Sequence, residues 1–129
     1  YSLPLASSAP NGTIIAIDAN PLMQSRLSFN ANSSEIKNIQ IICSAVSDKT
    51  GEGSLLIRKN DTAIVSLNED IKGSIKIDTL ENIIRDQKLK SIYGLKIDIE
   101  GHEDKALVPF LLNVGENLLP KRIVNIVSV

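Results

Sequence analysis

Three charged residues occupy alternate positions near the end of a strand predicted over residues 92–99. Strand geometry places Lys96, Asp98 and Glu100 on one side and the apolar residues between them on the other. Because unpaired charge is costly to bury, either the sheet is uncovered here, or Lys96 pairs with Asp98 and the carboxylates reach a site at the strand end. Such carboxylates can orient or deprotonate a hydroxyl group. An ion pair with no further role stays open as the alternative.

A second candidate is Asp18, which ends the apolar run of residues 13–17. An acidic residue that closes a strand before a strand-to-helix turn is placed to accept hydrogen bonds from both hydroxyls of a ribose. Ala19 and Asn20 follow it directly. The alternative is structural, because Asp-Ala-Asn-Pro also forms an Asx turn that caps a helix.

A third polar segment, residues 44–48, follows the apolar run of residues 39–43. In an open parallel sheet, ligands bind beyond the carboxyl ends of the strands. Residues 18–20, 44–48 and 98–100 are therefore the candidate ligand-binding segments. Cys43 lies inside the apolar run, and we expect a buried, inert thiol.

The segment after residue 100 adds two weaker candidates. His102 stands beside Glu103 at the start of a predicted helix, where a solvated side chain is the simpler interpretation and a catalytic base the alternative. Asp98, Glu100, His102 and Glu103 match no strong ligand spacing, so we expect no metal site.

The elements that position these residues alternate between strands and helices. Strands are predicted at residues 13–18, 39–43, 54–58, 63–67, 74–78, 92–99 and 122–127; helices are predicted from Pro21 to about residue 30, after Asp78 or Thr79, and after residue 101. The first strand, helix and second strand form a βαβ unit, to which residues 54–58 are expected to add through a tight hairpin. The order predicts one α/β domain over residues 1–129, with a mostly parallel sheet and helices on both faces.

Composition excludes several classes of partner. The chain has 129 residues, a formal net charge of −1 and 3% aromatic residues. It lacks the basic surface that nucleic acids or anionic membranes require, and the aromatic residues that stack on bases. No apolar run approaches the ~20 residues that span a bilayer. The single cysteine cannot form an internal disulfide, which fits a reducing compartment, and we expect the cytoplasm.

Three segments together resemble a known family. They are Ile-Ile-Ala-Ile-Asp-Ala-Asn-Pro at residues 14–21, Cys-Ser-Ala-Val-Ser-Asp-Lys-Thr-Gly at 43–51, and Leu-Lys-Ile-Asp-Ile-Glu-Gly-His-Glu at 95–103. In this order and spacing they are similar to the FkbM family of S-adenosylmethionine-dependent methyltransferases, and the third segment is the most specific. The resemblance implies a Rossmann-like class I methyltransferase fold, S-adenosyl-L-methionine as cofactor, and methyl transfer to a hydroxyl of a sugar, polyketide or related metabolite.

The resemblance also implies roles for residues. Asp18 matches the acid that binds the cofactor ribose, where the family more often has Glu, with Ala19 and Asn20 beside it. The loop against the adenine matches Ala45, Val46 and Ser47. The methyl-transfer pocket matches Lys96, Asp98 and Glu100, with Asp98 nearest the transferred methyl group.

One departure concerns the glycine-rich loop that cradles the methionine part of the cofactor. The one Gly-x-Gly sequence, Gly51-Glu52-Gly53, follows the second predicted strand and not the first, and Tyr1 matches the helix that follows this loop in the family. We therefore expect a sheet that is incomplete at its N-terminal side, in a piece of a longer protein whose upstream residues supply a strand and the loop.

Two other functions stay open. A non-catalytic α/β module would keep the scaffold for protein contacts, with an exposed apolar strip that a partner chain or a second copy in a homo-oligomer fills. A nucleotide-sugar-binding Rossmann domain depends on Asp18 alone. The methyl acceptor cannot be derived from the sequence.

Overall fold

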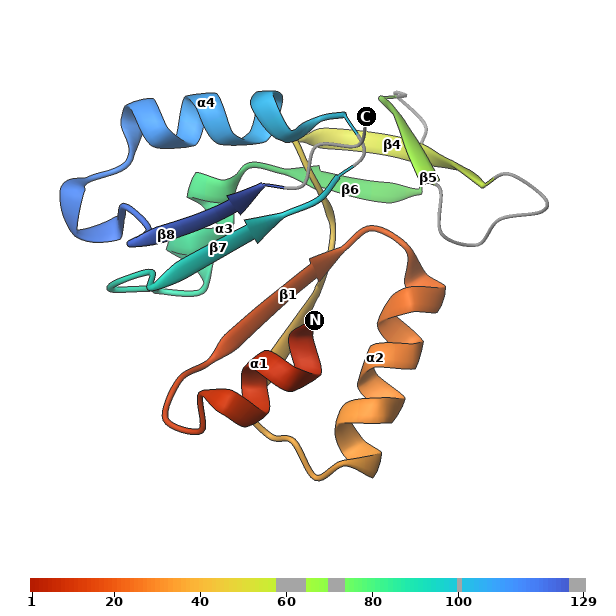
Figure 1. The fold of residues 1–129 in the computed structure, drawn as a ribbon. Coiled ribbons are helices and arrows are strands. Elements are labelled where there is room, and N and C mark those ends of the chain that lie inside the picture. The colour runs from red at the N-terminus through yellow and green to blue at the C-terminus, as the bar shows by residue number, and fades with distance from the viewer. Residues whose placement is uncertain (58–64, 70–73, 100, 126–129) are drawn as a thin grey trace. The chain divides into compact units, whose positions relative to one another are not determined.

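The fold is a mixed α/β arrangement with short sheets (Figure 1). The computed structural model describes residues 1–57, 65–69, 74–99 and 101–125. Their backbone contacts divide the chain into two compact units, Tyr1–Ala45 and Val46–Val129. Each unit is described by itself below.

The elements of the described residues follow in chain order. They are α1 (Ser2–Ser8), β1 (Ile14–Asp18), α2 (Pro21–Ser33), β2 (Ile39–Cys43), β3 (Ala45–Val46), β4 (Gly51–Ile57), β5 (Val65–Glu69), β6 (Ile75–Asp78), α3 (Leu80–Asp86), β7 (Gly94–Ile97), α4 (Glu103–Asn113), the short 3₁₀ helix Glu116–Leu118, and β8 (Arg122–Asn125).

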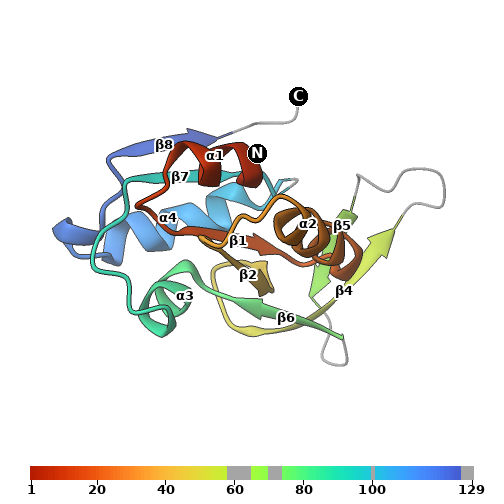
Figure 2. The same cartoon turned by 90° about the horizontal axis from the view of Figure 1, so that it is seen from below.

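The first unit contains the predicted βαβ unit. β1 and β2 pair in parallel, from Ile14 opposite Ile39 to Asp18 opposite Cys43. Both α1 and α2 contact both strands (Figures 1 and 2). The range predicted for β2 is confirmed. α2 runs past its predicted end because Ala31, which is buried, keeps the last turn packed.

The side chain of Asn38, just before β2, forms hydrogen bonds with the end of α1. Its side-chain Nδ2 lies 3.0 Å from the carbonyl oxygen of Ala6, 2.9 Å from that of Ala9 and 3.0 Å from that of Gly12. These groups lie at or after the C-terminal end of α1, where carbonyl oxygens lack helical partners. One amide group therefore links the end of α1 and the turn before β1 to the residue that precedes β2.

The second unit combines two kinds of sheet. A four-stranded sheet has the order β3-β6-β4-β5, with β4 antiparallel to both β5 and β6. β7 and β8 form a parallel pair, with Gly94 opposite Arg122 and Ile97 opposite Asn125. α3 and α4 contact each other. Their buried residues are Leu80, Ile83, Ile84, Ala106, Leu107 and Phe110.

One expectation is confirmed in part, and two need correction. A mixed α/β chain is confirmed; the described strands form short, mixed sheets, and a single mostly parallel sheet is not confirmed. The expected hairpin with the second strand is wrong, because β4 pairs with β5 and β6 and not with β2. Cys43, the last residue of β2, is exposed and not buried.

A buried carboxylate stabilises the second unit. Asp78, 3% exposed, accepts hydrogen bonds from the backbone N–H of Thr79 at 2.9 Å and from Asn82 Nδ2 at 3.0 Å. Its other oxygen lies 2.6 Å from Lys76 Nζ. Burial alone would raise the pKa of Asp78, but the bonds from Lys76, Asn82 and Thr79 outweigh it and hold the pKa below the ordinary value.

We expect the chain to lose stability in acid through Asp78. A carboxyl whose folded pKa is depressed stabilises the fold above its unfolded pKa, and this contribution is lost as the pH falls through the folded pKa. In urea unfolding, the free energy should therefore decline below about pH 4. Asp78→Asn should cost about 1.5–3 kcal/mol at pH 7 and flatten the acid decline. The exposed Asp86→Asn is the control; equal curves for both variants would contradict the assignment.

Candidate functional site

The carboxyl end of β1 carries Asp18, as the sequence predicts. Asp18 Oδ1 accepts a hydrogen bond from the backbone N–H of Asn20 at 2.7 Å. Asn20 is buried, and its own Oδ1 accepts from the N–H of Leu22 at 3.0 Å and caps α2. The Asx-turn alternative is therefore correct for one oxygen of Asp18. Asp18 is exposed, and its Oδ2 has no hydrogen-bond partner within the described part of the chain, so that oxygen is open to a ligand.

The segment after β2 begins at the same edge. Ser44 follows the register partner of Asp18, and its N–H donates to the Asp18 carbonyl oxygen at 3.3 Å. The structure thus brings the first two predicted segments together where they begin. The predicted adenine contacts, Ala45, Val46 and Ser47, are all buried. Their contact with adenine stays a prediction.

The second unit places Lys96 and Asp98 as a pair at the end of β7. Lys96 Nζ lies 3.5 Å from Asp98 Oδ2, with the side chains 26% and 36% exposed. Ile97 between them is buried, as strand alternation predicts. Asp98 lies one residue beyond the strand, and its Oδ1 has no hydrogen-bond partner among the residues that the structure describes. The pairing is confirmed, and one carboxylate oxygen is left to reach a ligand.

A turn connects this strand end to α4. Gly101 has a φ of +91°, which few residues other than glycine adopt. Glu103 accepts hydrogen bonds from the backbone N–H groups of Ile99 and Gly101, both at 2.9 Å. Sequence patterns missed this role of Glu103, because it depends on the path of the turn and not on residue spacing.

Two other candidates contribute less. Glu100 lies outside the described residues. His102 is the N-cap residue of α4, with no side-chain capping bond, in agreement with a helix-end role. Within residues 1–57, 65–69, 74–99 and 101–125, no group of three or more His, Cys, Asp or Glu side chains is arranged to hold a metal ion.

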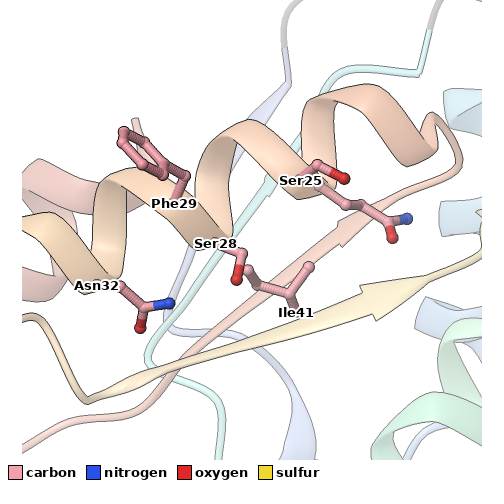
Figure 3. A pocket seen from close by; sticks show the side chains of 6 residues that line it. Ser25, Ser28, Phe29, Asn32 and Ile41 are labelled. Carbon is pink, nitrogen blue, oxygen red and sulfur yellow. The ribbon is translucent and has the colours of Figure 1, made fainter.

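The first unit also has an open pocket of about 520 Å³ that the sequence did not indicate. It is lined by Gln24, Ser25, Ser28, Phe29, Asn32 and Ile41 (Figure 3). The Phe29 ring is 70% exposed and points away from Ile41 (Figure 3). Gln24 also donates to the Asp18 carbonyl oxygen, so the pocket starts near the end of β1. The sequence feature that could have pointed to this pocket is Phe29, one aromatic residue in a helix without a clear apolar face.

Comparison with protein-family models, with curated proteins and with solved structures returned no match. Among the described helices, none combines the length and apolar character that a membrane crossing requires.

Proposed function

We propose that the chain is an S-adenosylmethionine-dependent methyltransferase of FkbM type that methylates a hydroxyl of a sugar or related metabolite. One observation carries the proposal. Asp18 and Asp98 each stand at the carboxyl end of a parallel strand pair, with one oxygen engaged and the other open within the described residues. Ligands of open parallel sheets bind at such ends.

In this proposal, Asp18 in the first unit binds the ribose of the cofactor. The open Oδ2 of Asp18 accepts a hydrogen bond from a ribose hydroxyl, and the Asx turn holds this carboxylate in a fixed direction. Ala19 and Asn20 continue this edge. The adenine contacts that we propose are Ala45, Val46 and Ser47. These residues are buried, so the proposed contact goes through their backbone groups.

In this proposal, residues of the second unit carry out the methyl-transfer step. The acceptor oxygen attacks the sulfonium methyl group in line, so that an O–C bond forms as the S–C bond breaks and S-adenosylhomocysteine leaves. Asp98 orients the acceptor hydroxyl and takes its proton. Lys96 pairs with the carboxylate of Asp98 at this strand end. Glu100 completes the pocket in this proposal.

The proposal includes a larger sheet of the class I type. Two-stranded parallel pairs are rarely stable alone, because parallel strands bury both faces. The residues of β1 other than Asp18 are all half-buried, in agreement with further strands or helices that cover them. We also propose a cytoplasmic location, because the single cysteine cannot form an internal disulfide and this fits a reducing compartment.

Calorimetric titration of the full-length gene product with S-adenosylhomocysteine tests the proposal. We expect saturable binding, and Asp18→Asn should raise the dissociation constant at least ~10-fold, the effect of losing a charged hydrogen bond. The control is Glu35→Gln. Glu35 is the other acidic residue of the first unit and is exposed, so the same loss of charge there should leave binding unchanged. Absence of binding at high micromolar ligand would overturn the proposed function.

A protein-interaction module is the second candidate. Ile123 and Val124 of β8 are 41% and 55% exposed although neighbouring residues of a strand face opposite sides. Both sides of this strand thus present apolar surface that a partner chain or a second copy could cover. Light scattering separates the candidates: a stable oligomer that binds no cofactor would favour the module.

A further inference from the structure

Glu103 ties the first turn of α4 to the end of β7. Its Oε1 accepts from the N–H of Ile99 and its Oε2 from the N–H of Gly101, each at 2.9 Å. An acidic residue that serves only its own helix contacts the N–H groups of that helix. These two bonds instead go to residues that precede α4, so both carboxylate oxygens hold the connecting turn.

The two bonds restrain a turn that contains glycine. Glycine restricts the backbone less than any other residue, so hydrogen bonds to Glu103 on both sides of this position limit the conformations of the turn. Burial would raise the pKa of Glu103, but hydrogen bonds from the N–H groups of Ile99, Glu103 itself and Gly101 lower it below the ordinary value. The carboxylate is therefore ionised at neutral pH and is a strong acceptor for both amides.

Asp98 lies between two fixed points of the backbone. On one side, Ile97 is the last paired residue of β7. On the other, the N–H of Ile99 is held by Glu103. The ion pair of Asp98 with Lys96 is partly exposed and 3.5 Å long, and such pairs hold a side chain weakly. The direction of the Asp98 carboxylate is thus set mainly by its backbone.

We propose that Glu103 is a positioning residue that fixes the turn after β7 and, through it, the Asp98 carboxylate. This role builds on the proposed function, in which Asp98 meets the methyl acceptor. Glu103 itself touches neither cofactor nor acceptor, because both of its oxygens are bound to the backbone.

Amide exchange and carboxyl resonances measured by NMR test the role without any activity. In Glu103→Ala, the amides of Ile99 and Gly101 should exchange about 10-fold faster, and the carboxyl ¹³C resonance of Asp98 should shift. Glu103→Gln keeps one acceptor oxygen, so only one of the two amides should accelerate; this milder variant also serves if Glu103→Ala fails to fold. The control Asp104→Ala removes an exposed acidic residue from the same helical turn and should change neither readout.

Kinetics supply a second readout. Glu103→Ala should lower kcat at least ~10-fold while the KM for S-adenosylmethionine stays within about twofold, because the loss falls on orientation and not on cofactor binding. Exchange rates and an Asp98 resonance equal to those of the wild type would overturn the role of Glu103. So would accelerated exchange with an unchanged kcat. A wild-type protein without methyl transfer would contradict the proposed function, and the NMR readouts would still decide whether Glu103 positions Asp98.

Discussion

Asp98→Asn should reduce the rate of S-adenosylhomocysteine formation at least ~100-fold, the typical effect of losing a general base. The amide keeps the size of the carboxylate but cannot accept the proton of the acceptor hydroxyl, and it loses the ion pair with Lys96. The dissociation constant for S-adenosylhomocysteine should change less than about threefold, because the proposed function has Asp98 act on the acceptor and not on the cofactor. Both quantities are measured on the full-length protein with a panel of sugar and metabolite acceptors.

Asp104→Asn is the matched control for Asp98→Asn. Asp104 is an exposed residue in the first turn of α4, so its variant carries the same change of charge away from the strand end. Wild-type rates in Asp98→Asn would show that this carboxylate does not take the proton. Equal losses in the two variants would point to a general charge effect instead.

Phe110→Ala should destabilise the second unit by about 3–5 kcal/mol, the range for removing a buried aromatic side chain. Phe110 is 0% exposed and lies on α4, which contacts α3. Truncation of its ring leaves a cavity among the apolar residues of these helices, and the neighbours cannot close around it completely. Urea unfolding followed by circular dichroism measures the change.

Leu112→Ala is the control for Phe110→Ala. Leu112 lies on the same helix but is 78% exposed, so its truncation should change the free energy of unfolding by less than about 0.5 kcal/mol. If Phe110→Ala cannot be purified folded, Phe110→Leu should show a smaller loss of about 1–2 kcal/mol. Similar free energies for the Phe110 and Leu112 variants would contradict the core assignment.

Local signals in the sequence predicted most elements and one part of the site. Asn20 before Pro21 marks the start of α2, and Thr79 caps α3 through a bond to the N–H of Asn82 at 3.2 Å. Alternation along one strand placed Lys96 and Asp98 on the same side, and their pairing was one of the two outcomes that it left open. These features depend on residues two to four positions apart, where backbone geometry alone decides which groups meet.

Features that depend on distant segments were not predicted. The partners of β4 are β5 and β6, and the residues of β4 do not show which later strand will pair with them. Cys43 shares its apolar run with half-buried isoleucines, and the apolar pattern alone does not distinguish its exposed position from theirs. The role of Glu103 could be found only from the path of the turn, because its hydrogen bonds go to backbone groups that have no sequence signature.

Ultraviolet cross-linking of radiolabelled S-adenosylmethionine, followed by tryptic mapping, tests the proposed cofactor site most directly. Cleavage after Arg26, Lys37 and Lys49 separates residues 1–26, which contain Asp18, from 27–37 and from 38–49, which contain the segment after β2. We predict an adduct that S-adenosylhomocysteine competes away and that maps to residues 1–26 or 38–49. No competable adduct, or one confined to other peptides, would contradict the account.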